Sequence, residues 1–136
     1  MKLIQLPFFQ LKKWGKELGL KNFYVLMRDE IKQLKERKQF SCIYNIHESN
    51  EKGIHWDCIF KINNFCYCFS SYGLPPIKEI LNICEHGIYS TFKLQELGEK
   101  ICGQMCLYFL FELNKNSSEG NYKSIILKLH ELKYQS

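Results

Sequence analysis

Residues 101–113 read ICGQMCLYFLFEL, a stretch that is apolar on nearly every side. In a water-soluble domain such a segment forms a helix enclosed by other elements, so we predict the central helix of the fold here. Cys102 stands at its start, preceded by the polar stretch QELGEK and followed by Gly103. The segment therefore predicts both the centre of the core and a cysteine at a helix terminus.

Upstream of this helix the apolar residues alternate with period two, which is typical of strands. Three runs show the pattern: FSCIYNIH from residue 40, GIHWDCIFKI from residue 53 and FCYCFS from residue 65. The dipeptide Asn63-Asn64 tolerates left-handed geometry and suits a tight turn between the last two runs. We therefore expect a three-stranded antiparallel meander, with further extended pieces at 23–27 and 88–94.

Helical spacing is found in four other segments. They are residues 8–19, which end at Gly19, the charged segment 28–38, residues 77–86 after Pro75-Pro76, and residues 122–133. A chain of 136 residues suffices for one core and is too short for two ordinary domains. The predicted fold class is α+β, with a mixed sheet packed on the central helix in one domain spanning 1–136.

Composition and charge indicate in which cellular environment the protein acts and what it could bind. No apolar run approaches the roughly 20 residues that span a bilayer, and the first ten residues make a poor signal peptide. We expect an intracellular protein whose seven cysteines are reduced thiols rather than a disulfide framework. The net charge of +5 is concentrated in the first forty residues. That region is either a solvated helix surface or a surface for DNA or an acidic partner.

Cys102 and His55 are the candidates for chemistry. At a helix start, the helix dipole and unpaired backbone N–H groups favour a thiolate and can stabilise an oxyanion. A histidine distant in sequence, on a predicted strand, could act as the base that a cysteine hydrolase needs. The alternatives are a small core cysteine and a structural histidine. The chain lacks paired zinc-site cysteines and a glycine-rich phosphate loop, so we expect neither a metal nor an organic cofactor.

Several of these segments resemble a known family, in the same order along the chain. The matching pieces are GIHW at 53–56, FSSYG at 69–73 with LPP after it, Gln95, ICGQMCLYFL at 101–110, and the leader-like FQLKKWGKELGLKNFYVLMRDE at 9–30. Together they resemble the adenovirus maturation protease (adenain) and its relatives in Maverick/Polinton transposons and adinto-like viruses. That family belongs to the same clan as the SUMO-specific proteases. The resemblance covers roughly residues 9–113 and implies an adenain-like cysteine-protease fold.

Carried over residue by residue, the resemblance implies a catalytic constellation. Cys102 would be the nucleophile, His55 the general base and Gln95 an oxyanion donor beside the backbone N–H of Cys102. Gln95 precedes Cys102 by seven residues, as in the family. Trp56 would form a wall of the site.

One position departs from the family pattern. Where relatives carry the third, acidic member of the triad, this chain has Ser70. A neutral hydroxyl can orient the imidazole but cannot stabilise the imidazolium. Asp57, two residues after His55 on the same strand face, is a substitute acid or, alternatively, a solvent-facing strand residue.

The resemblance also implies a function. We expect a thiol endopeptidase that cleaves viral or transposon capsid precursors during virion maturation, weakened by the loss of the acid at Ser70. It would act as a monomer in the nucleus or cytoplasm of a host cell or in the virion, with DNA or a peptide as a possible activator. Two alternatives stay open: a degenerate protease fold kept as a binding or scaffold module, and an isopeptidase acting on ubiquitin-like proteins.

Overall fold

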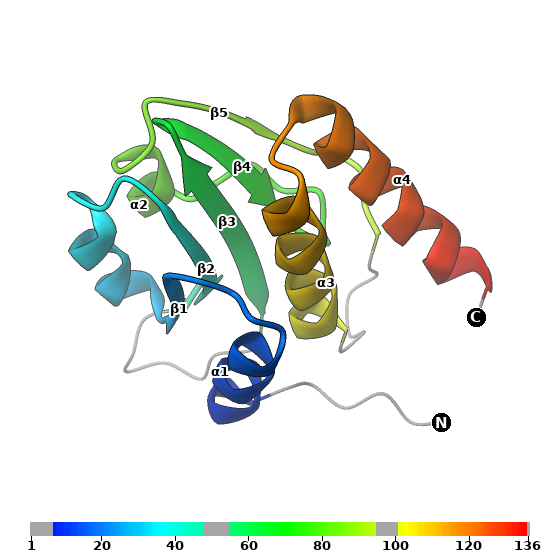
Figure 1. The fold of residues 1–136 in the computed structure, drawn as a ribbon, viewed down its shortest axis with the longest axis horizontal. Helices are drawn as coiled ribbons and strands as arrows, with labels where there is room; N and C mark the ends of the chain where they lie inside the picture. Colours follow the sequence, from blue (N-terminus) through cyan, green and yellow to red (C-terminus); the bar gives the residue numbers. More distant parts are fainter. Residues whose placement is uncertain (1–6, 48–54, 95–100, 136) are drawn as a thin grey trace.

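The computed structural model describes residues 7–47, 55–94 and 101–135 and is built around one mixed sheet (Figure 1). The five strands lie in the order in which they occur in the chain. They are β1 (Phe23–Leu26), β2 (Phe40–Asn45), β3 (Trp56–Ile62), β4 (Phe65–Phe69) and β5 (His86–Tyr89). The predicted α+β class is confirmed.

The centre of the sheet is the predicted antiparallel meander. β2 pairs antiparallel with β3, and β3 pairs antiparallel with β4. Between β3 and β4, Asn63 and Asn64 have φ angles of 52° and 62°. Positive φ at both central residues is the geometry of the tightest hairpin turns, and asparagine tolerates it better than most residues.

Both edge strands run parallel to their neighbours, β1 to β2 and β5 to β4. The predicted extended piece at 23–27 is confirmed by β1. The piece predicted at 88–94 is wrong in extent, because β5 covers His86–Tyr89. Just after it, the Ser90 hydroxyl accepts a hydrogen bond from the Phe92 backbone N–H, a local turn that competes with strand pairing.

The helical elements are α1 (Phe8–Glu17), η1 (Arg28–Leu34), α2 (Lys78–Leu81), α3 (Cys102–Lys115) and α4 (Glu119–Gln135). All five predicted helical segments contain helix. Two are shorter than the pattern suggested: η1 is a 3₁₀-helix and α2 a single turn. After α1 the chain reverses at Gly19, which has a φ of 75°.

Helices cover both faces of the sheet (Figure 1). α3 and α4 pack on one face, while η1 and α2 pack on the other. Successive residues of a strand point to opposite faces, so in β3 Cys58 and Phe60 join the α3 side and Ile59 joins the η1 side. On α3 itself, Phe109 and Leu110 are fully buried. This two-sided burial explains why the central strands are buried at nearly every position.

Two of the cysteines form a disulfide, although the sequence analysis predicts that all of them are free thiols. Cys66 of β4 and Cys84, which follows α2, form a disulfide with their Cα atoms 6.1 Å apart. The expectation that every cysteine is a free thiol is therefore wrong for this pair, because the chain after α2 folds back onto β4. The free cysteines among the described residues are all buried: Cys42, Cys58, Cys68, Cys102 and Cys106.

Within the described ranges, no helix is long and apolar enough to cross a membrane.

The turn after β4 provides a test of the fold. Gly73 has a φ of 70°, and a Cβ there would lie 2.6 Å from the Thr91 carbonyl oxygen. At Gly19, with a φ of 75°, a Cβ would meet nothing within 4 Å. We expect Gly19→Ala to lower the free energy of unfolding by about 1–2 kcal/mol, the cost of left-handed backbone. Gly73→Ala should cost about 1–3 kcal/mol more, because a backbone clash is added.

Urea denaturation of the two variants measures this difference directly. Equal losses would mean that residues 91–92 do not pack against the turn as the structure has them.

Candidate active site

Cys102 is the first residue of α3, and its sulfur lies against the start of β3. The Trp56 backbone N–H donates a hydrogen bond to Cys102 Sγ over 3.4 Å. One helical turn later, Cys106 Sγ donates to the Trp56 carbonyl oxygen over 3.6 Å. These two contacts tie the amino-terminal turn of α3 to the first residue of β3. The apolar face of α3 packs on the sheet, where Phe109 and Leu110 share a core cluster with Cys58 and Phe60 of β3.

His55 directly precedes β3, and its imidazole is held by a carboxylate from the same strand. His55 Nε2 and Asp57 Oδ1 are 2.6 Å apart. Both residues are buried, with 2% and 3% of their surfaces exposed. The alternative of a solvent-facing Asp57 is therefore wrong, since this carboxylate is a buried partner of the candidate base. The structure places an acid beside His55 that does not come from the turn at Ser70.

The environment of His55 favours its charged form. Burial lowers the pKa of His55, but hydrogen bonding to Asp57 and to the Cys102 side chain, together with the electrostatic interaction with these two groups, raises it more. The balance raises the pKa from 6.5 to about 9. At neutral pH the ring is an imidazolium that lies between a carboxylate and the candidate nucleophile.

The second ring nitrogen of His55, Nδ1, is the atom left to interact with the candidate nucleophile. His55 Nδ1 is buried and has no hydrogen-bond partner of good geometry among the described residues. The Cys102 thiol nevertheless influences the ring strongly enough to raise its pKa. Catalytic hydrogen bonds are often long or poorly aligned without substrate and tighten in the complex.

The FSSYG turn supplies an aromatic ring instead of an acid. The Tyr72 ring stacks on His55 with centroids 4.1 Å apart and planes 16° from parallel. The Ser70 hydroxyl accepts a hydrogen bond from the Tyr72 backbone N–H over 3.3 Å, which helps to set the turn. A cation over an aromatic face is attracted by the ring's negative π surface. The sequence analysis did not predict a role for Tyr72, although Tyr72 stands two residues after Ser70.

The remaining predicted site residues have different outcomes. Trp56 is buried, and its side chain belongs to the core cluster that includes Cys102 and Cys106. Gln95 lies outside the described residues. The residue before it, Leu94, donates its backbone N–H to the Ser71 carbonyl oxygen over 2.7 Å, so the chain is anchored to the FSSYG turn just before Gln95.

The start of α3 has the electrostatics that an oxyanion site requires. Among the described residues no side chain caps the amino terminus of α3, and its first turn contains no acidic residue. The first backbone N–H groups of a helix have no intrahelical partner, and the positive end of the helix dipole lies there. The described part of the chain contains no group of three or more potential metal ligands.

Both central side chains are covered. Cys102 is 1% exposed and His55 is 2% exposed. A substrate carbonyl therefore reaches the sulfur only when part of the surrounding structure moves aside.

Comparison with known proteins identifies the fold. No protein-family model matches the sequence, and neither does a curated protein. The crystal structure of the ASFV pS273R protease matches with a TM-score of 0.58 and 15% identity over 95% of this chain. A selenomethionine crystal structure of the same protease matches with a TM-score of 0.57 and 17% identity over 95% of this chain.

The chain has the fold of this viral protease. It spans 66% of the length of that protein in each structure. The likeness supports the predicted protease fold, while the roles of individual residues rest on the geometry described above.

The site makes a prediction about pH. His55 binds its proton more tightly in the folded chain than in the unfolded one, because its pKa rises from 6.5 to about 9. Its contribution to stability is therefore complete below about pH 6.5 and is lost as the pH rises through about 9. We expect the His55 Cε1–H resonance to titrate near pH 9 in proton NMR spectra.

In Asp57→Asn the hydrogen-bonding carboxylate is gone and the effect of burial is opposed only by Cys102. The midpoint should then move to clearly lower pH, with the other histidines serving as internal references. An identical midpoint in both proteins would contradict the pairing of His55 with Asp57.

Proposed function

We propose that this chain is a thiol endopeptidase in which Cys102 is the nucleophile, His55 the general base and acid, and Asp57 the residue that orients and charges His55. The observation that carries the proposal is the 2.6 Å contact between His55 Nε2 and Asp57 Oδ1, next to a cysteine at a helix start. The protease fold of the structural neighbours supports it. The acid that seemed lost at Ser70 is then supplied by β3.

The proposed reaction has two steps. The Cys102 thiolate attacks the scissile carbonyl carbon, and the carbon–nitrogen bond breaks as imidazolium His55 gives its proton to the leaving amine. A water molecule then loses a proton to His55 and attacks the thioester, which releases the carboxylic acid and regenerates the Cys102 thiolate beside imidazolium His55.

During both steps the negative charge on the carbonyl oxygen faces the first N–H groups of α3, with Gln95 as the further donor that the sequence predicts. Asp57 stays ionised and stabilises the imidazolium, the role of the acid in a serine-protease triad.

The substrate is proposed on the resemblance in the sequence. Capsid precursor proteins cut at small, glycine-containing sites during virion maturation are the substrates that it implies. DNA or a peptide as activator, a monomeric enzyme without cofactors, and action in the host nucleus, cytoplasm or virion belong to the same proposal. An isopeptidase for ubiquitin-like proteins would use the same three side chains.

One observation favours a second candidate function. Cys102 is almost fully covered, with 1% of its surface exposed. A protease fold whose nucleophile stayed sealed would serve as a binding or scaffold module. The two candidates differ in whether an electrophilic peptide can reach the sulfur of the folded protein.

Labelling by a peptide vinyl sulfone with glycine at its carboxyl end separates these candidates. We expect the native protein to form one stoichiometric adduct on Cys102. This adduct should form far faster than the adduct of the same probe with free cysteine. Cys102→Ala should abolish the adduct. Cys42→Ala is the matched control, because Cys42 is also a fully buried free thiol but packs on the other face of the sheet, and it should label at a rate close to that of the native chain.

Labelling no faster than free cysteine would exclude the peptidase and favour the scaffold. Offering capsid-derived and ubiquitin-derived peptide probes side by side then identifies the substrate class by the faster adduct.

A further inference from the structure

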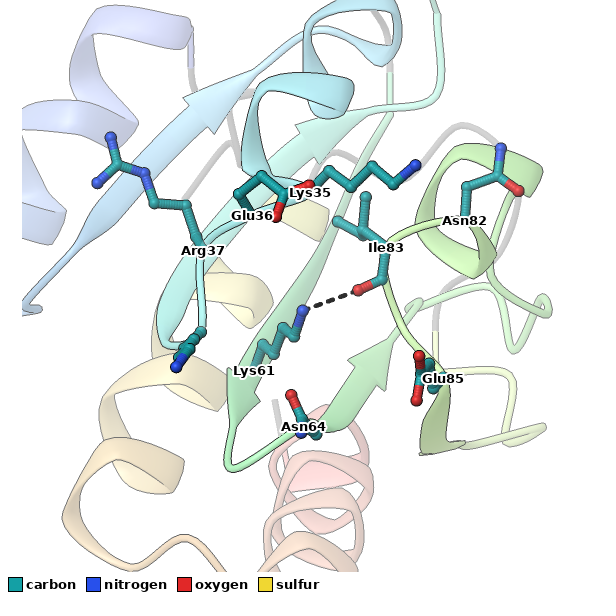
Figure 2. Close-up of a pocket in the computed structure, with 9 residues that line it drawn as sticks. Lys35, Glu36, Arg37, Lys61, Asn64, Asn82, Ile83 and Glu85 are labelled. Atoms are coloured by element: carbon teal, nitrogen blue, oxygen red, sulfur yellow. Dashed lines mark hydrogen bonds between the residues drawn. The ribbon is translucent and has the colours of Figure 1, made fainter.

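A polar cavity lies at the opposite end of β3 from His55. It has a volume of about 270 Å³ and opens between the segment after η1 and the segment after α2 (Figure 2). Its lining is almost entirely polar: Lys35, Glu36, Arg37, Lys38, Lys61, Asn64, Asn82, Ile83 and Glu85. His55 and Lys61 are six residues apart, about 20 Å along an extended strand, so this cavity is separate from the candidate active site.

Lys61 is the unusual member of the lining. Only 7% of its surface is exposed, and its Nζ donates a hydrogen bond to the Ile83 carbonyl oxygen over 2.9 Å. Among the described residues no carboxylate forms an ion pair with it. An ammonium has three donors, so Lys61 keeps two that a ligand can use. A buried charge without a counter-charge is costly, and an anion in the cavity would offset that cost.

The charges around the cavity indicate the sign of its ligand. The lining contains four cationic side chains and two carboxylates, Glu36 and Glu85, so it carries a net charge of about +2. The guanidinium of Arg37 is turned over the Tyr24 ring, 5.9 Å from its centre. In Figure 2, the Lys35 side chain extends toward the segment that carries Asn82, and the Lys61 side chain points toward the Ile83 carbonyl oxygen. Lys35 and Lys61 are the two lysines labelled in Figure 2, and both point toward the segment after α2.

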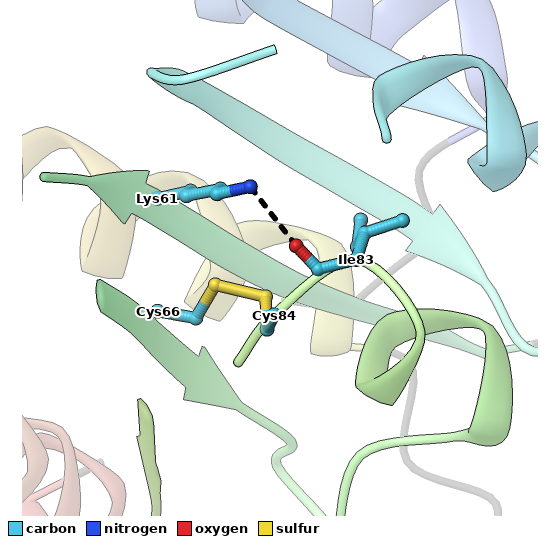
Figure 3. The surroundings of a disulfide bond; sticks show 4 residues. All are labelled: Lys61, Cys66, Ile83 and Cys84. Atoms are coloured by element: carbon cyan, nitrogen blue, oxygen red, sulfur yellow. Dashed lines mark hydrogen bonds between the residues drawn. A yellow bond between two sulfur atoms is a disulfide. The ribbon is translucent and has the colours of Figure 1, made fainter. Parts of the chain in front are cut away.

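The wall that carries Ile83 is fixed covalently. Cys84 is bonded to Cys66, and Cys66 is the β4 partner of Lys61 in the sheet (Figure 3). The disulfide thus holds the carbonyl that accepts the Lys61 hydrogen bond beside the strand pair that carries Lys61. A site whose groups are held in place before binding loses less entropy when a ligand arrives.

We propose that this cavity binds the phosphate group of a small anion, with Lys61 and Lys35 as charge partners and the amides of Asn64 and Asn82 as further donors. Phosphate carries between one and two negative charges at neutral pH, which matches the lining, and lysine binds it as a point charge. The volume of about 270 Å³ lies just below the roughly 300–1,000 Å³ of pockets for drug-sized ligands, so the ligand is small. The proposal does not depend on peptidase activity.

Calorimetric titration of the full chain with inorganic pyrophosphate tests the site at constant ionic strength. We expect saturable one-to-one binding that weakens at least tenfold in Lys61→Met, which keeps the length of the side chain and removes its charge. Lys35→Met should also weaken binding, by about threefold or more. Glu85→Gln should strengthen it, because one carboxylate of the lining becomes neutral. Lys128→Met, on the exposed side of α4, is the matched control and should bind like the native chain.

Because Lys61 is buried, circular dichroism must first show that Lys61→Met is folded. If it is not, the opposite effects expected of Lys35→Met and Glu85→Gln decide the matter. Titration with adenosine monophosphate in parallel distinguishes a free phosphate from one carried by a larger molecule. No saturable binding by the native chain, or equal affinities for Lys35→Met, Glu85→Gln and Lys128→Met, would overturn the proposal.

Discussion

The short hydrogen bond between His55 and Asp57 is the contact on which the proposed chemistry depends. It joins His55, which directly precedes β3, to Asp57 within β3, and both residues are removed from water. A buried carboxylate needs a charged or donating partner, and the imidazole provides one. The resulting imidazolium is stacked under Tyr72 and influenced by the Cys102 thiol, which α3 brings to the start of β3. The proposed nucleophile, base and acid thus lie at the start of one helix and at the start of one strand.

β3 carries a buried charge near each end. Residues 57, 59 and 61 point to the same face of the sheet, where Ile59 packs in the core between Asp57 and Lys61. Asp57 is compensated by His55, whereas the partner of Lys61 among the described residues is the Ile83 backbone carbonyl. The same strand therefore places a complete ion pair in the candidate active site and an incompletely satisfied cation in the polar cavity.

Sequence reasoning succeeded where the signal is local. The apolar run of α3, the alternation of β2 to β4 and the asparagine pair in their turn each follow from residues close together in the chain. Cys102 could be placed at a helix start for the same reason.

The failures concern contacts between distant segments. The Cys66–Cys84 disulfide and the stacking of Tyr72 on His55 arise only when separate elements meet. Asp57 was recognised as a candidate acid, but its burial could not be read from strand alternation, because β3 is covered by helices on both faces. With two covered faces, neither side of the strand is the solvent side.

The most direct measurement compares two acid candidates by the rate at which a peptide electrophile inactivates Cys102. Asp57→Asn preserves shape and removes the charge, whereas Ser70→Ala removes the hydroxyl that occupies the family's acidic position. The account predicts that Asp57→Asn slows inactivation at least tenfold, with about 10⁴-fold as the limit set by serine-protease triads. It predicts that Ser70→Ala stays within about threefold of the native rate, since only one 3.3 Å hydrogen bond is lost. A native-like rate in Asp57→Asn with a large loss in Ser70→Ala would contradict it.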